Sequence, residues 1–144
     1  MDAVWVNELY IAIAPAATEG GEPTWAKLCK GIEGMTFTEN EQNQQYFFIC
    51  GEGFAHNETT GAAPELAITG RRIVGDAAQD YIAGMQFKLG TDRNSQAKVI
   101  SGGKQMVCAC SIGGITSFGG NTLDVNAFGC TIRFNGKPVV TDVA

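Results

Sequence analysis

The sequence predicts an α+β fold, mainly antiparallel β, in which a β-sandwich or small barrel is flanked by one α-helix at about residues 76–89. Three observations support this. Short apolar runs separated by glycine and polar clusters recur along the chain, as expected for many short strands. Nineteen glycines follow no repeat and fit tight turns. One stretch alone has a helical apolar period and a helix cap. We expect a single domain spanning 1–144, since a chain of this length can bury roughly 70% of its unfolded surface.

The first half of the chain is predicted to hold short strands separated by three long loops. The loop Thr38–Gln45 is expected because TENEQNQQ is poor in apolar residues, whereas the following YFFIC is typical of a strand. The expected strands are Glu8–Ala14, two pieces of Trp25–Phe37 broken by Gly31 and Gly34, Tyr46–Cys50, and Glu65–Val74. The expected loops are Ala16–Pro23, Thr38–Gln45 and Gly51–Pro64.

The helix is the best-supported single element. Asp76 is a good N-cap, and Gln79, three residues later, has the spacing of a capping box. The residues at helical spacing, expected to face the core, are Ala78, Tyr81, Ile82, Met85 and Leu89, with Gln79, Asp80, Gln86 and Lys88 nearer solvent. Gly90 can close the helix. Because residues 85–89 also alternate, a strand starting after Gly84 stays open as the alternative.

The second half of the chain is predicted to be strands only. Asn135-Gly136 between two apolar runs is a strong hairpin pattern, because both residues tolerate positive φ. The expected strands are Ala97–Ser101, Gln105–Ile112, Leu123–Phe134 and Pro138–Val143, with a loop at Gly113–Asn121. In sum we expect about eight strands and one helix.

The charge distribution excludes some partners and favours self-association. The net charge is −5, and the ten basic residues are scattered, which disfavours specific nucleic-acid binding and an anionic membrane. Only 17% of residues are charged, against roughly 25% in typical domains, so we expect much of the surface to be covered by other copies. We expect no membrane span, since no apolar run has the necessary length, and no signal peptide.

No catalytic, cofactor or metal site is expected, and the chain is predicted not to be an enzyme. His56 is the only histidine and is assigned to a loop, and the carboxylate pair Glu39/Glu41 is expected to be solvated. The cysteines are odd in number and lack C-x-x-C spacing, so we expect buried, reduced thiols, typical of the cytosol. They are Cys29, Cys50, Cys108, Cys110 and Cys130.

The segment Ile68–Gly90 resembles the strand–helix unit of tail tube proteins of long-tailed bacteriophages. In that family a strand of the form x-G-[KR]-[RK] runs into Gly-Asp-x-Ala-x-Asp-Tyr-Ile and a helix ending near Leu-Gly. The matching positions are Gly70-Arg71-Arg72, Gly75-Asp76, Ala78, Asp80-Tyr81-Ile82 and Leu89-Gly90. Ala77 departs from relatives that have proline there, and either residue suits the first helical position. Phe134–Pro138 is similar to the closing hairpin of the family.

The resemblance implies a structural subunit of stacked hexameric rings that form a hollow tube conducting DNA during ejection. It implies homo-oligomeric contacts, tape-measure and tail-terminator partners, and a location in the virion tail after synthesis in the bacterial host cytoplasm. Six chains carry about −30 formal charges per ring, which repels phosphate, so DNA is expected to pass without specific binding. We therefore expect acidic residues to be enriched on the lumen-facing sheet.

Polarity and length place the expected ring contacts in the loops, with the interface at Asn43, Gln44, Gln45 and Tyr46. A tube of a phage-like bacteriocin or other injection device is a close variant. A β-sandwich module binding carbohydrate or a cell-surface ligand is the main alternative, with Trp5, Trp25, Tyr46, Phe47 and Phe48 as its stacking residues. A small enzyme or metal protein is the third hypothesis.

Overall fold

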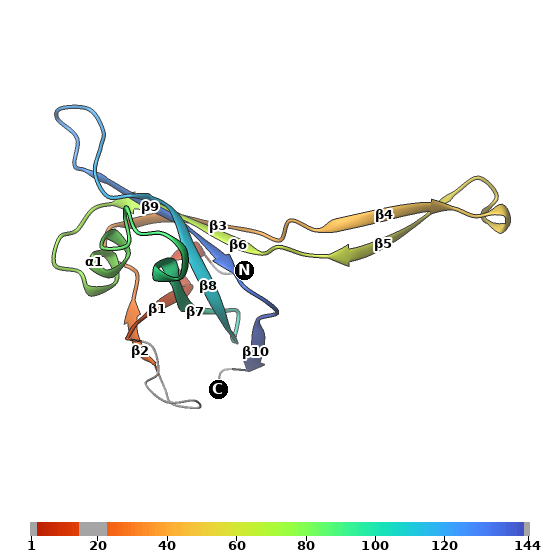
Figure 1. Ribbon diagram of the computed structural model, residues 1–144, viewed down its shortest axis with the longest axis horizontal. Coiled ribbons are helices and arrows are strands. Elements are labelled where there is room, and N and C mark those ends of the chain that lie inside the picture. Colours follow the sequence, from red (N-terminus) through yellow and green to blue (C-terminus); the bar gives the residue numbers. More distant parts are fainter. Residues whose placement is uncertain (1–2, 15–22, 143–144) are drawn as a thin grey trace.

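The computed structural model describes residues 3–14 and 23–142, and within these ranges the chain is antiparallel β with one α-helix (Figure 1). This confirms the predicted α+β class. The strands are β1 (Glu8–Ala14), β2 (Thr24–Lys27), β3 (Ile32–Thr38), β4 (Gln42–Phe47), β5 (Ala55–Gly61), β6 (Glu65–Arg71), β7 (Asn94–Ser101), β8 (Lys104–Thr116), β9 (Ala127–Phe134) and β10 (Val139–Asp142). The helix is α1 (Ala77–Ala83), and 3₁₀ turns lie at η1 (Val4–Val6), η2 (Ile49–Gly51) and η3 (Gly90–Arg93). The expected loop Ala16–Pro23 falls, except for Pro23, outside the described residues.

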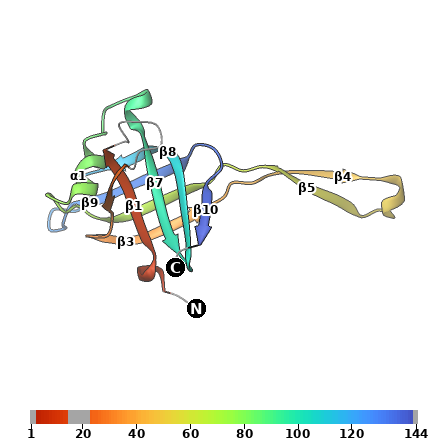
Figure 2. The ribbon, with the colours of Figure 1, turned by 90° about the horizontal axis from the view of Figure 1, so that it is seen from below.

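Eight strands form one continuous sheet in the order β2-β1-β7-β8-β9-β6-β3, with β10 also paired to β8. Strand β3 is distant from β7 and β8 in the sheet order, yet Met35 and Phe37 of β3 line one cavity together with Val99 of β7 and Met106 of β8. The sheet must therefore curl to bring these strands together. Figure 2 shows β1, β7 and β8 crossing β3, β6 and β9. The sandwich-like core is therefore enclosed by one bent sheet. Gly34, expected to break a strand, lies inside β3 at an irregularity in its pairing with β6.

Strand alternation fills the core, since every second residue of β7 and β9 points inward. Cys110 and Cys130 lie in this core, and burial raises the pKa of each thiol to about 12. Cys108 is buried too, whereas Cys29 and Cys50 are exposed. The expectation of buried thiols was therefore wrong for these two cysteines, since Cys29 follows β2 in a connecting turn and Cys50 lies in η2.

The helix is shorter than the sequence predicted. Ala78, Ile82 and Met85 pack into the core as expected, but α1 ends at Ala83 and Leu89 is 81% exposed. Gly84 is the C-cap, and the chain then turns through Phe87, whose φ is +71°. The alternative strand after Gly84 is also wrong, since this segment holds turns followed by η3.

The Asn135-Gly136 hairpin was a wrong prediction. β9 and β10 do not pair with each other but pair in succession with β8, as shown by Phe134 opposite Cys110 and Val139 opposite Val107. The physical reason is the length of β8, which spans Lys104–Thr116 and extends past β9, so that its first residues remain open to β10. Gly136 still takes a positive φ, here in a bend between two strands on the same edge.

Candidate assembly surface

Strands β4 and β5 form a hairpin, here called the arm (residues 42–61), that projects from the body of the molecule (Figures 1 and 2). The sequence predicted loops at Thr38–Gln45 and Gly51–Pro64, and that was wrong for residues 42–45, which belong to β4, and for residues 55–61, which form β5. Polar residues pair across the two strands, as when the Thr59 hydroxyl donates to Asn43 Oδ1 at 2.8 Å. A strand that is polar on both faces has no apolar alternation, so periodicity could not identify it.

The arm continues the edge of the main sheet. The last pair of the β3–β6 ladder is Thr38 with Glu65, and the Ala63 N–H then donates to the Glu39 carbonyl at 2.9 Å. Asn40 takes a φ of +51° and its side-chain amide donates to the Ala63 carbonyl at 3.0 Å, which bridges the interruption. Phe48 follows Thr38 by ten residues, and an extended strand rises about 3.3 Å per residue. Phe48 therefore lies up to roughly 33 Å from the end of the β3–β6 ladder.

The arm buries no side chain in the single chain. All of β4 is exposed, and so is all of β5 except its last residue. A two-stranded hairpin is at best marginally stable by itself in water. In the single chain the arm is therefore held by strand pairing and not by a core of its own.

The end of the arm is apolar. The described residues between β4 and β5 contain η2 and a turn, with Glu52 and Gly53 at positive φ. We call residues 47–54 the tip; its large exposed apolar side chains are Phe47, Phe48, Ile49 and Phe54. The predicted strand Tyr46–Cys50 thus ends at Phe47, and its aromatic residues are presented to solvent instead of a core.

The two faces of the arm differ in chemistry. Tyr46 pairs with His56 and Gln44 with Glu58, and His56 Nε2 lies 2.6 Å from Glu58 Oε1. The other face is uncharged, with Asn43 opposite Thr59 and Gln45 opposite Asn57. The four residues expected at the interface are therefore all on β4, divided between both faces.

Negative charge is concentrated in the arm and its base. Residues 39–64 contain four glutamates and no lysine or arginine, which leaves eleven acidic and ten basic residues in the rest of the chain. The four are Glu39, Glu41, Glu52 and Glu58. Glu39 and Glu41 lie side by side at the base, where a hydrogen bond between the two carboxyls raises the pKa of Glu39. Nearly all of the net charge of −5 is thus carried by the arm and its base.

A second exposed apolar segment follows α1. In residues 84–93, here called the Phe87 loop, Phe87 is 88% and Leu89 81% exposed. Lys88 lies between them, and Arg93 holds the loop by donating from Nε to the Lys88 carbonyl at 2.7 Å. This loop combines apolar side chains with two cations and one carboxylate, Asp92.

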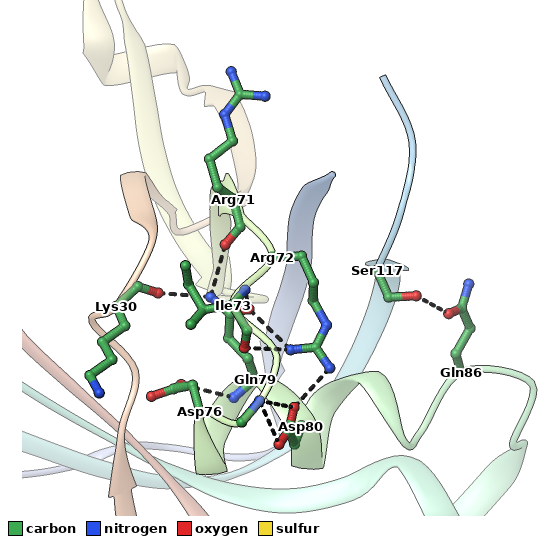
Figure 3. A network of polar contacts seen from close by, with 10 residues as sticks. Lys30, Arg71, Arg72, Ile73, Asp76, Gln79, Asp80, Gln86 and Ser117 are labelled. Carbon is green, nitrogen blue, oxygen red and sulfur yellow. Dashed lines mark hydrogen bonds and ion pairs between the residues drawn. The ribbon is translucent and has the colours of Figure 1, made fainter. Parts of the chain in front are cut away.

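The junction between β6 and α1 is a satisfied polar network (Figure 3). Asp76 is the N-cap of α1, and its carboxylate accepts from the Gln79 N–H at 3.2 Å. The sequence had predicted that the Gln79 side chain closes a capping box and lies nearer solvent, and both predictions were wrong. The side chain is fully buried, where Oε1 accepts from the Ile73 N–H at 2.7 Å and Nε2 donates to the carbonyls of Lys30 and Arg71 at 2.7 and 3.0 Å.

Three further residues of the quoted motif, Gly70, Arg72 and Asp80, make contacts that shape this junction. Arg72 donates to Asp80 Oδ1 at 2.8 Å, and this bond together with the Gly75 N–H lowers the pKa of Asp80. A Cβ on Gly70 would lie 2.2 Å from the Gly31 carbonyl oxygen, so no larger residue fits. These residues fix how the helix leaves the sheet.

The described part of the chain holds no cluster of three metal-ligating side chains. His56, the only histidine, lies on the exposed arm beside Glu58. Among the described residues, no helix is long and apolar enough to cross a membrane. The most distinctive surface is therefore the arm.

Comparison with known proteins gives a match in structure only. No model of a protein family matches the sequence, and no curated protein does. A chain in a solved structure, described as the tail of an empty gene transfer agent particle refined with helical and C6 symmetry, superposes with a TM-score of 0.74. The fold is that of a particle-tail protein. The likeness covers 98% of this chain and 99% of that one at 10% sequence identity, so it includes the arm and establishes the fold.

Proposed function

We propose that this chain is a structural, non-catalytic subunit of a tail tube, assembling as six-fold rings that stack on one another. The observation that carries the proposal is the arm, a long hairpin that buries nothing in the free chain and ends in exposed aromatic residues. Exposed apolar surface of this kind marks an interaction site. The shared fold with a chain of a C6-symmetric particle tail supports rings as the form of assembly.

The remaining parts of the proposal follow from that role. The tube conducts DNA during ejection, resides in the virion tail after synthesis in the host cytoplasm, and meets tape-measure and terminator proteins at its ends. The strands of the main sheet hold four acidic residues, Glu8, Glu33, Glu65 and Asp142, against five basic ones. An acidic lumen that repels DNA would therefore need the glutamates of the arm and its base. The enrichment of acidic residues on the lumen-facing sheet stays a prediction.

A tube in a phage-like bacteriocin or injection device would use the same contacts, and genes beside this one would distinguish the two. The carbohydrate-binding alternative lacks one platform for all five of its aromatic residues. On the arm, only Tyr46 and Phe48 stack, with ring centroids 5.9 Å apart. Trp5 is in η1, Trp25 is in β2 below the Lys98 ammonium, and Tyr46 and Phe47 face opposite sides of β4.

The test is negative-stain electron microscopy of the purified protein over a range of concentrations. We expect rings or tubes at raised concentration, and a chain that is monomeric throughout would overturn the proposal. Replacing Asn43, Gln44, Gln45 and Tyr46 together by serine should reduce tube yield far more than it changes the melting temperature. Asn121→Ser, an exposed amide outside the arm, is the matched control and should assemble normally.

A further inference from the structure

We propose that the tip of the arm docks on the Phe87 loop of a second copy of this chain, so that subunits associate head to tail. This inference rests on the proposed function and deepens it, since it names the surface that receives the arm.

The two surfaces are chemically complementary. The tip presents Phe48, Ile49 and Phe54 with the carboxylate of Glu52 among them. The Phe87 loop presents Phe87 and Leu89, with the cationic residue Lys88 between them in the sequence. Apolar contact supplies the attraction in such an interface, while opposite charges select the partner and suppress wrong ones.

A second exposed apolar loop is a poorer acceptor. Residues 117–126, which connect β8 to β9, expose Phe118, Leu123 and Val125, but their only charged side chain is Asp124. A glutamate brought against an aspartate is repelled. Charge therefore selects the Phe87 loop over the β8–β9 loop as the acceptor for an acidic tip.

The backbone at Phe87 indicates that this side chain is held outward. A φ of +71° is an outlier for a bulky aromatic residue, and no burial in the free chain compensates for it, since the side chain is 88% exposed. Strain of this kind persists where it serves binding or function. A contact with another copy supplies the missing burial.

The positions of the two surfaces make the contact an open one. Figure 1 shows the arm extending from one end of the body and α1, which leads into the Phe87 loop, at the other. A contact between two different surfaces is heterologous, and it propagates along an axis unless rotation closes it into a ring. Docking between two separate surfaces of an elongated subunit therefore allows ring-on-ring stacking.

The native Cys50 at the tip allows a direct test by disulfide trapping. In a Cys29→Ser background, Leu89→Cys is purified, assembled, oxidised and run on a denaturing gel without reductant. A disulfide needs the two Cα atoms within about 7 Å. We expect a ladder of covalent oligomers that extends beyond six subunits, since each link joins one ring to the next.

Matched controls make the outcome decisive. Leu123→Cys in the same background places a thiol on the rejected loop and should give no ladder, and Cys50→Ser should abolish every ladder. Absence of tubes from the unmodified protein would contradict the proposed function itself. Tubes that form normally but give a ladder only with Leu123→Cys, or one that stops at six, would overturn the docking inference and leave the tube intact.

Charge reversal tests the same contact without a covalent bond. Glu52→Lys and Lys88→Glu should each raise the concentration needed for assembly by about tenfold, because like charges then face each other. The double variant should recover to within about twofold of the parent, as expected for a coupled pair. A double variant that assembles no better than the weaker single variant would count against this pairing.

Discussion

The body and the arm are built from the same antiparallel pairing but differ in what the pairing encloses. In the body, inward-facing residues of β7 and β9 alternate with outward-facing ones, and the core contains Ile132 and Phe128 at almost no exposure. In the arm, β4 is exposed on both faces and continues the β3–β6 ladder outward. Burial thus explains why the body folds, whereas the direction of the arm is set by the β3–β6 ladder that it extends, and the arm has no core of its own.

This difference in burial between body and arm predicts that substitutions in the body lower the free energy of unfolding more than substitutions in the arm. The largest loss is expected for Gln79→Ala, which leaves the Ile73 N–H and the carbonyls of Lys30 and Arg71 without their buried partner. At about 1–3 kcal/mol per unsatisfied group, the three groups together give an expected loss of roughly 3–9 kcal/mol in denaturant unfolding. Gln79→Glu keeps an acceptor for the Ile73 N–H but sets a carboxyl oxygen against the carbonyls of Lys30 and Arg71, so it should cost about as much as Gln79→Ala. A wild-type curve for Gln79→Ala would refute this role.

A core truncation should cost nearly as much. Ile132 is fully buried in β9, so Ile132→Ala is expected to lower the free energy of unfolding by about 2–5 kcal/mol through lost burial and a cavity. Ile132→Val, as the conservative comparison, should cost about 0.5–1.5 kcal/mol. Equal stability of Ile132→Ala and the parent would mean that this part of the core is loosely packed.

The Arg72–Asp80 pair should have a smaller, pH-dependent effect. The pKa of Asp80 is lowered in the folded chain, so its contribution is present above the ordinary aspartate pKa near 3.9 and is lost as pH falls through the lower folded value. Asp80→Asn should have a lower melting temperature than the parent at neutral pH. The gap between the two melting temperatures should narrow at acid pH. A difference that is the same at pH 7 and pH 2.5 would exclude an electrostatic contribution.

The smallest effect on the free chain is expected in the arm. Phe48→Ser with Ile49→Ser removes exposed side chains, so the free energy of unfolding of the monomer should stay within about 0.5 kcal/mol. Assembly, measured by sedimentation and microscopy, should nevertheless be lost. A large destabilisation of the monomer would show that the tip packs within its own chain and would remove the contrast between arm and body.

Local sequence patterns predicted the structure correctly where a side chain interacts with its own helix or strand. The fold class, the Glu8–Ala14 strand and the capping of α1 at Asp76 could all be read from spacing. The predictions failed where a distant strand decided the outcome. Gln79 was assigned to solvent because helical period alone cannot show that the Lys30 carbonyl, 49 residues earlier, requires a donor. The Asn135-Gly136 turn was read as a hairpin because nothing local indicates that β8 is long enough to pair with both flanking strands.

The sequence by itself determined the elements of this protein: mainly antiparallel strands, one capped helix and a low charge that indicated a covered surface. Only the tertiary structure decided that residues 42–61 form an arm. Its strands carry no apolar alternation, and they form because β3 and β6 are already paired where the arm begins. Contacts between residues far apart in the chain supply that order, and no local periodicity encodes it.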